Sequence, residues 1–493
     1  MMKLHILWAL VAAAALASCG GSDSSPAPTP APTPTPAPAP TPIASDRIEP
    51  LDTALRPSSA VLKVASGATK NYPAGAPVPR VTLGALVAGK SLIQAGNGTA
   101  LKIGEGRAIP ATASAQDLAS LLSWNPTADG GKVAAVAFSA EGARAIRLAV
   151  LAEDVPEGTV LRFYGAEGDE VVEMNTTQIA DLRAANMMGG VTGDAARMVW
   201  GPDTTGAVST LEVQLPANVD PGRLRLAVPH LSHLTTTVEE SVMQPKTVAS
   251  IGDAASCHLD VMCRPDLEAE SRSLAKIMFS TSAGTFMCTG ALLNDAASSR
   301  TPYFLTASHC IGTQDVASTL VAYWFFRAAS CNSAPRLDSA MTRTVGGAQL
   351  LFANTAIDNT LLQLNTRPPA RVVYAGSYFG ADVGPGFGVT SVHQPRGDLQ
   401  KYSVGQIMSY AVCTDNNCAD TNANVGSRLR VSWQQGATEL GSSGAPLFAQ
   451  LNSTRYVVGT LWGGASSCQN PSGADYYGRF QNSYAQGINK WLN

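Results

Sequence analysis

The cysteines constrain this chain more than any other feature, because almost all of them crowd into one half of it. Of nine cysteines among 493 residues, eight lie in the C-terminal half: Cys257, Cys263, Cys288, Cys310, Cys331, Cys413, Cys418 and Cys468. In an exported chain such a cluster indicates a disulfide framework. Eight cysteines allow on the order of 100 pairings, so the sequence alone does not choose one. Their spacings do not match a zinc site, and we expect no metal.

The ninth cysteine ends an N-terminal export signal. Lys3 precedes an apolar run from Ile6 to Leu16, and Leu16-Ala17-Ser18-Cys19 resembles the lipobox of bacterial lipoproteins. The run is too short to span a bilayer. We therefore expect a signal peptide over residues 1–18 and a lipid anchor at Cys19 that attaches the exported chain to the bacterial outer membrane or cell surface. The alternative is an ordinary signal peptide that ends at a cysteine by chance.

A proline-rich spacer follows over residues 19–49. Every second residue from Pro26 to Pro42 is proline, alternating with Ala or Thr. This pattern favours an extended polyproline conformation and a semi-rigid link between the membrane and whatever follows.

The rest of the chain has the composition of a folded protein that does not bind nucleic acid. Hydrophobic residues make up 45%, enough for a sizeable core. Lys and Arg number 34 and Asp and Glu 37, so the net charge is 34 − 37 = −3, and only 14% of residues are charged. Phosphate binding requires a basic excess or a basic stripe, so we expect no nucleic-acid partner.

Residues 50–246 are predicted to form a β-rich propeptide domain. They contain no cysteine, and short apolar runs alternate with Gly, Pro and Asp clusters. His230 and His233 could be a metal pair, but no third ligand clusters near them, and packing or surface roles are the better interpretation. The predicted strands are Lys132–Phe138, Ala145–Leu151, Thr159–Tyr164 and Leu211–Leu215.

Residues 247–493 are predicted to form a second all-β domain. A pair of β-barrels fits the number and spacing of its apolar runs. In a closing helix, Ser483–Leu492, the helical spacing puts Ala485, Ile488, Trp491 and Leu492 on one face. The predicted strands are Tyr303–Ala307, Val321–Phe326, Thr360–Leu364, Leu429–Trp433 and Tyr456–Trp462.

A nucleophile and its base are suggested by two motifs in this domain. His309 follows the apolar strand in Phe-Leu-Thr-Ala-Ser-His-Cys, and Ser443 lies in the glycine-flanked turn Gly-Ser-Ser-Gly-Ala-Pro. Such a turn exposes the serine Oγ and allows the amides of Gly441 and Ser443 to point at a developing oxyanion. A serine triad also needs an acid that holds the histidine tautomer. Asp358 is the best of seven candidate aspartates, because it directly precedes a predicted strand.

The resulting order His309, Asp358, Ser443 is that of chymotrypsin-like proteases. The domain resembles bacterial lysyl endopeptidases, a branch of that family. Ordered matches cover nearly all of Ser256 to Asn493: Ser-Cys257 to Cys263, Cys288 to Asn294, Tyr303 to Cys310, Asp358 to Leu364, Gly441 to Gly444, Gly463 to Cys468 and Asp475 to Arg479. The resemblance implies a double β-barrel with a C-terminal helix, preceded by a β-rich prodomain.

The resemblance also implies disulfides between Cys257 and Cys468, Cys263 and Cys331, and Cys288 and Cys310. Cys413 and Cys418 are additional to the family, and we pair them by exclusion; the alternative is two free thiols. Trp462 stands where lysine-specific members carry histidine, so Leu461-Trp462-Gly463 is closer to the substrate-binding strand of trypsins. His393 matches a family motif and is expected to be structural.

We therefore expect a monomeric serine endopeptidase that acts on proteins or peptides and needs no cofactor. Ser443 would be the nucleophile, His309 the general base and then acid, and Asp358 the residue that orients the imidazole. The alternative is a catalytically silent binding lipoprotein that keeps the fold.

The resemblance places a specificity aspartate at Asp475, which implies cleavage after basic residues, with lysine favoured, and Trp462 and Gly463 would line the substrate site. Glu439 is interpreted as solvated. Ser442 cannot pair with a new N-terminus, so we expect the propeptide to assist folding or block the cleft. It would be cut between Val242 and Ser256, with Lys246 the natural point, and this cut would separate the protease from its anchor.

Overall fold

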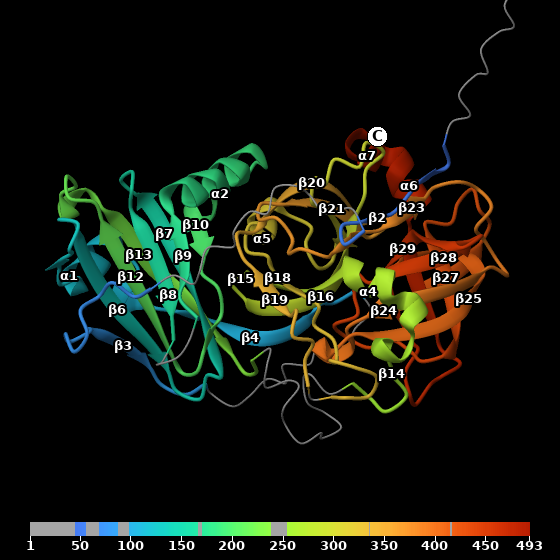
Figure 1. The fold of residues 1–493 in the computed structure, drawn as a ribbon, viewed down its shortest axis with the longest axis horizontal. Helices are drawn as coiled ribbons and strands as arrows, with labels where there is room; N and C mark the ends of the chain where they lie inside the picture. The colour runs from blue at the N-terminus through green and yellow to red at the C-terminus, as the bar shows by residue number, and fades with distance from the viewer. Residues whose placement is uncertain are drawn as a thin grey trace, which may run out of the picture. The chain divides into compact units, whose positions relative to one another are not determined.

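The computed structural model of the protein describes residues 45–55, 69–86, 98–165, 170–237, 254–334, 336–414 and 417–493. The predicted signal peptide, Cys19, residues 19–44 of the predicted spacer and Lys246 lie outside these ranges, whereas residues 45–49, also assigned to the spacer, are described. Residues from Ser45 onward form one compact unit, in which strands dominate (Figure 1). Within the described ranges, every helix is too short or too polar to cross a membrane.

Two sheets pack face to face over residues 69–237, which we call the N-terminal domain. One sheet has the order β3-β6-β12-β8-β9, and the other contains β10-β7-β13-β4. Both contribute to a single core that includes Phe138, Phe163, Leu148 and Leu231. The strands are β3 Arg80–Leu83, β4 Leu101–Ala108, β5 Asn125–Pro126, β6 Lys132–Ala140, β7 Ala145–Asp154, β8 Val160–Tyr164, β9 Val172–Asn175, β10 Met198–Trp200, β11 Thr204–Thr205, β12 Val208–Leu215 and β13 Arg225–Leu234.

Two helices that the sequence analysis did not predict complete this domain. They are α1, Ala115–Leu121, and α2, Thr176–Met188. Each begins with a capping box, in which the side chain of Ser114 or Asn175 accepts from the amide three residues later and that residue's side chain accepts in return.

Residues 254–493 form the protease domain, which contains two barrels. The first barrel surrounds a core that includes Trp324 and Phe304. Its strands follow the order β19-β18-β15-β16-β17-β21-β20. The predicted strands at Tyr303–Ala307, Val321–Phe326 and Thr360–Leu364 are found here, each within a few residues. Its elements are α4 Glu268–Ser273, β15 Leu274–Thr281, β16 Gly284–Leu293, β17 Tyr303–Ala307, α5 Gln314–Ala317, β18 Val321–Trp324, β19 Thr342–Thr344, β20 Ala348–Asn354 and β21 Asn359–Leu364.

The second barrel closes on itself, because β29 pairs with both β28 and β30. Its ring runs β29-β28-β24-β25-β27-β30. A third apolar cluster, which includes Leu305, Leu361 and Phe448, lies between the two barrels. The strands are β14 Leu259–Asp260, β22 Val373–Tyr374, β23 Gly376–Tyr378, β24 Gly388–His393, β25 Lys401–Thr414, β26 Asn417–Thr421, β27 Arg428–Gln435, β28 Pro446–Leu451, β29 Thr454–Gly464 and β30 Ala474–Arg479.

The C-terminal helix is interrupted, and its predicted apolar face is wrong in part. Short helices α6, Phe480–Ser483, and α7, Asn489–Leu492, flank a wider turn containing Gly487, whose φ of 154° is not helical. Ile488 and Leu492 are buried, but Ala485 is exposed and Trp491 is 38% exposed. The break rotates the last turn away from the register that an uninterrupted helix would have.

Four disulfides join the cysteines of the protease domain. They are the three pairs implied by the resemblance, Cys257–Cys468, Cys263–Cys331 and Cys288–Cys310, and the pair reached by exclusion, Cys413–Cys418. The last pair links facing residues of the β25–β26 hairpin.

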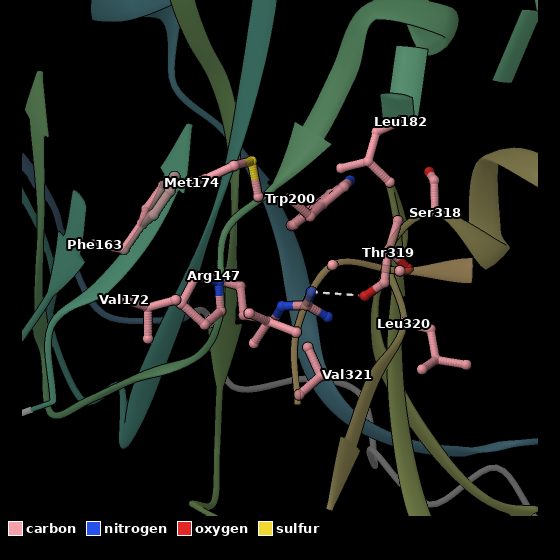
Figure 2. A pocket seen from close by; sticks show the side chains of 14 residues that line it. Arg147, Phe163, Val172, Met174, Leu182, Trp200, Ser318, Thr319, Leu320 and Val321 are labelled. Carbon is pink, nitrogen blue, oxygen red and sulfur yellow. Dashed lines mark hydrogen bonds between the residues drawn. The ribbon is translucent and has the colours of Figure 1, made fainter. Parts of the chain in front are cut away.

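Strand β4 joins the N-terminal domain to the first barrel, because it pairs with β13 on one side and β16 on the other. Beside this junction the guanidinium of Arg147, on β7, is fully buried. It donates to the backbone oxygens of Gly201 and Thr319 at 3.0 and 2.8 Å and to Ser280 Oγ at 2.8 Å. Figure 2 shows Arg147 reaching Thr319 across a narrow pocket lined by both domains.

Residues 45–55, which we call the strap, lie on the protease domain and not on the N-terminal domain. Strand β1, Arg47–Ile48, pairs with β23, and β2, Leu51–Asp52, pairs with β22. Residues 50–55, expected to begin the propeptide domain, thus pack against the segment that connects the two barrels.

Candidate active site

His309 and Asp358 meet because they lie at the ends of two paired strands. Strand β17 ends at Ala307, which lies opposite Asn359, the first residue of β21. The Nδ1 of His309 is 2.7 Å from one oxygen of the Asp358 carboxylate, and the backbone amide of His309 donates to the other oxygen at 2.8 Å. Asp358 is buried and has a φ of 67°, a left-handed conformation that aspartate tolerates better than most residues.

This arrangement leaves Nε2 as the ring nitrogen of His309 that can accept a proton. An ionised carboxylate only accepts hydrogen bonds, so the proton of a neutral imidazole belongs on Nδ1. The Nε2 atom is buried and has no hydrogen-bond partner among the described residues. It is therefore available to accept a proton.

The Ser443 turn is held against the strands that lead to His309. The amide of Thr289, on β16, donates to the carbonyl oxygen of Ser443 at 2.8 Å, and the Thr289 hydroxyl donates to that of Gly441 at 3.0 Å. A Cβ at Gly444 would lie 2.3 Å from the hydroxyl of Thr306 on β17, so only glycine fits there. These contacts bring Ser443 to the edge of the first barrel that carries His309.

The amides of Gly441 and Ser443 have the freedom that an oxyanion hole needs. Within the described part of the chain they donate to no protein acceptor, whereas Ser442 donates to Glu439 at 3.0 Å and Gly444 to Leu461 at 2.8 Å. Gly441 has a φ of 94°, a backbone conformation that glycine adopts much more readily than other residues. Hydrogen bonds of Ser442 and Gly444 thus hold the turn in place, while the amides of Gly441 and Ser443 stay unused.

Behind the turn lies a buried polar cluster, and it overturns the expectation that Glu439 is solvated. The Glu439 side chain is only 9% exposed. Its carboxylate lies 2.9 Å from His258 Nε2 and 3.0 Å from Arg396 Nε, and it accepts from the amide of Ala255 at 3.1 Å. Burial raises the pKa of Glu439, but His258 and the other donors outweigh it and lower that pKa overall. Sequence spacing gave no sign of these partners, because they come from two segments that lie far from Glu439 in the chain.

His393 is structural, in agreement with the expectation. Its Nδ1 lies 2.8 Å from Ser442 Oγ and its Nε2 3.1 Å from Ser403 Oγ, and the ring is fully buried. Burial lowers its pKa well below the usual value, so the ring is neutral. His230 and His233 lie on β13 in the N-terminal domain, away from this site.

Asp475 is fully buried on β30 and its two oxygens differ in environment. Oδ2 accepts from Trp433 Nε1, Thr438 Oγ1 and Ser466 Oγ at 2.6, 2.7 and 2.6 Å. Among the residues that the structure describes, Oδ1 accepts only from the amide of Ser466, at 3.3 Å. Burial raises the pKa of this carboxyl, and the hydrogen bonds oppose the rise. These three donors could not be predicted from the sequence, although Thr438 is only a few residues before Ser443.

Trp462 and Gly463 lie on β29, whose next residue, Gly464, packs directly against the Asp475 carboxylate. The guanidinium of Arg428 lies 4.8 Å from the centre of the Trp462 ring. The indole also lies close to Gly98, where a Cβ would be 2.6 Å from Nε1. Chain that enters β4 of the N-terminal domain therefore touches the strand predicted to bind substrate.

Two Cys–His groups are close enough to suggest metal ligands, Cys257 with His258 and Cys468, and Cys288 with His309 and Cys310. In each group the two sulfurs form a disulfide. Disulfide sulfurs are not thiolates, so neither group offers the ligands of a transition-metal site.

A double β-barrel with a histidine–aspartate pair beside a glycine-flanked serine defines the chymotrypsin-like class of serine proteases. Comparison with known proteins agrees with this assignment to the serine proteases. Residues 251–478 match the model of the lysyl endopeptidase C-terminal domain, and residues 76–235 match that of the lysyl endopeptidase N-terminal domain. A lysyl endopeptidase of Pseudomonas aeruginosa is 32% identical over 404 residues, which cover 79% of this chain and 81% of that protein. The chain belongs to the lysyl endopeptidase family and is a serine endopeptidase.

Solved structures with similar folds include two proteases. Protease Anisep from Arthrobacter nicotinovorans is 19% identical, with a TM-score of 0.32, and the match covers 44% of this chain and 94% of that one. The thermostable serine protease AL20 from an extremophilic microorganism is 16% identical, with a TM-score of 0.32, and the match covers 45% and 98%.

Proposed function

We propose that the protein cleaves peptide bonds after lysine, with Ser443, His309 and Asp358 as its triad. Ser443 Oγ attacks the peptide carbonyl carbon while His309 Nε2 takes the hydroxyl proton, and His309 then gives that proton to the leaving amine. Water hydrolyses the acyl-enzyme by the same steps in reverse order. The observation that carries this proposal is the His309–Asp358 contact of 2.7 Å, with Nε2 left unpartnered among the described residues.

The unused amides of Gly441 and Ser443 would stabilise the oxyanion of each tetrahedral intermediate. Donors that are already oriented pay no reorganisation cost when charge develops on the carbonyl oxygen. In other serine proteases, the loss of one such donor slows catalysis by about 100-fold or more.

The unequal oxygens of Asp475 support the proposed preference for lysine. An arginine guanidinium binds a carboxylate best through both oxygens at once, whereas an ammonium is a compact charge that needs only one. Three donors already occupy Oδ2 of Asp475, so Oδ1 is the oxygen with capacity for a substrate cation. Such a carboxylate favours lysine over arginine.

We also propose that the protein is exported and anchored at Cys19, and that the N-terminal domain blocks the cleft until the chain is cut between Val242 and Ser256. The contact of Gly98 with Trp462 supports the blocking role, because it brings the N-terminal domain's chain to the substrate strand.

The triad is tested by replacing Ser443 with alanine and labelling with a fluorophosphonate. We expect loss of both labelling and peptidase activity with an unchanged fold, because only one hydroxyl is removed. Ser453→Ala, at an exposed turn between β28 and β29, is the matched control and should keep both. Labelling that persists in Ser443→Ala, or a parent protein that never labels, would refute the assignment and favour a silent binding protein.

A further inference from the structure

The strap, residues 45–55, is attached to the protease domain by two short stretches of backbone pairing. Arg47 and Ile48 face Tyr378 and Ser377, and Leu51 and Asp52 face Tyr374 and Val373. Further hydrogen bonds lie at both ends: the amide of Phe379 donates to Asp46 at 2.9 Å, and that of Thr53 donates to Val372 at 3.3 Å. The strap therefore adds two short strands, β1 and β2, to the segment that connects the two barrels.

Its two apolar side chains enter two different cores. Leu51 belongs to the core of the first barrel and Ile48 to the cluster between the barrels, and both are at most 5% exposed. A Cβ at Gly376 would lie 2.6 Å from the carbonyl oxygen of Ile48, so the glycine at this position permits the close approach. The protease domain is thus shaped to receive the strap.

Charged groups hold the strap in register. Asp52 forms an ion pair with Arg272, whose side chain is nearly buried. The Glu49 carboxylate accepts from the Tyr456 hydroxyl at 2.8 Å, and its backbone oxygen accepts from the side-chain amide of Asn294 at 2.9 Å. Among the described residues, every hydrogen bond and ion pair from the strap to another element goes to the protease domain. The strap also lies outside both segments that match the lysyl endopeptidase models, residues 76–235 and 251–478.

We propose that the strap is a permanent strand of the active protease, which keeps the N-terminal fragment bound after the chain is cut. The proposal rests on the processing proposed above. A cut between Val242 and Ser256 breaks the chain after the N-terminal domain but leaves the strap seated on the barrels. If Cys19 carries a lipid, the cut enzyme then stays at the membrane, in contrast to the release expected from sequence.

The test uses the full-length Ser443→Ala protein with recognition sites for an added site-specific protease inserted in residues 56–68 and 238–253. Two cuts yield a strap fragment, the N-terminal domain and the protease domain. Native size-exclusion chromatography with mass spectrometry then shows which pieces travel together. We expect the strap fragment to elute with the protease domain. A strap fragment that elutes free or with the N-terminal domain overturns the proposal.

Variants make the result specific. Ile48→Asp with Leu51→Asp should lower the bound fraction at least about tenfold, because two charges would enter apolar cores. Leu55→Asp is the matched control, since Leu55 is 80% exposed and should have no effect. If the double variant does not fold, Glu49→Gln with Asp52→Asn should still speed dissociation. The proposal would be contradicted if the strap fragments of the parent and the double variant bound the protease domain equally well. It would also be contradicted if Leu55→Asp lowered the bound fraction as much as the double variant does. Catalysis plays no part in this readout, so its outcome is separate from that of the proposed activity.

Discussion

At the scale of single residues, the site depends on charged groups placed where their partners are already fixed. Asp358 holds His309, three side chains hold one oxygen of Asp475, and Glu439 braces the serine turn from behind. Each of these carboxylates is buried or nearly so. A change at any of them therefore leaves its partners unsatisfied, as well as removing a charge.

Asp475→Asn should remove the preference for basic residues. The amide keeps the shape but not the charge, so a substrate ammonium would be desolvated without a counter-charge. We expect kcat/KM for lysine substrates to fall by about 100-fold or more, with leucine substrates little changed. Peptides that differ only in Lys, Arg or Leu at the cleavage position measure this. An unchanged preference would exclude Asp475 from the specificity pocket.

Glu439→Gln should lower kcat more than it raises KM. Its carboxylate contacts His258, Arg396 and the amide of Ala255, and its backbone oxygen accepts from Ser442 within the oxyanion turn. Loosening this contact would displace the amides of Gly441 and Ser443, which in the proposed mechanism stabilise mainly the transition state, so we expect a fall in kcat of about tenfold. Asp420→Asn, at an exposed position of β26, is the control. A change confined to KM would argue against this positioning role.

At the scale of elements, the strands were the most predictable part of the fold and the irregular segments the least. Continuous apolar runs located β6, β7, β17 and β29 to within a few residues, because most residues of each strand are buried on both faces. The strap escaped prediction because strands of two residues are too short to form such a run, and α2 because its caps lie in a stretch interpreted as β-rich. The proposed triad was predictable since two of its members adjoin predicted strands, whereas the braces of Glu439 and Asp475 depend on tertiary contacts.

Strand β15 buries a lysine, and this gives stability a pH dependence that can be measured. Lys276 Nζ donates to the backbone oxygen of Gly397 at 2.6 Å, and burial lowers its pKa to about 7. The unfolded chain keeps this lysine protonated to about pH 10, so unfolding takes up a proton above pH 7 and stability rises with pH in that window. Lys276→Met removes the effect.

We expect the free energy of unfolding of Lys276→Met, relative to the parent, to fall by about 2 kcal/mol between pH 7 and pH 9. Urea titrations in the Ser443→Ala background, followed by tryptophan fluorescence at each pH, provide the measurement. Lys490→Met, at an exposed position, should show no such trend. A difference between variant and parent that is independent of pH would mean that Lys276 stays charged across this range.

At the scale of the whole molecule, the N-terminal domain and the barrels share a sheet and a buried cation. Burial lowers the pKa of Arg147 to about 10, and its donors satisfy oxygens on both sides of the junction. Arg147→Met should speed release of the cut N-terminal domain at least about tenfold, because buried oxygens lose their partners. Dissociation of the N-terminal domain after cuts in both residues 56–68 and 238–253 measures this, with Arg223→Met as an exposed control. Equal rates would show that docking does not depend on this cation.

The shared strand also decides what the barrel presents once the N-terminal domain leaves. Strand β4 covers residues Gly284 to Met287 of β16, on the side where β17 no longer reaches. Its departure uncovers a short run of backbone donors and acceptors, which is the kind of open border that recruits foreign strands and seeds aggregation. The protease without its N-terminal domain therefore has an exposed strand edge that its precursor does not have. We expect concentrated preparations of it to aggregate through this edge.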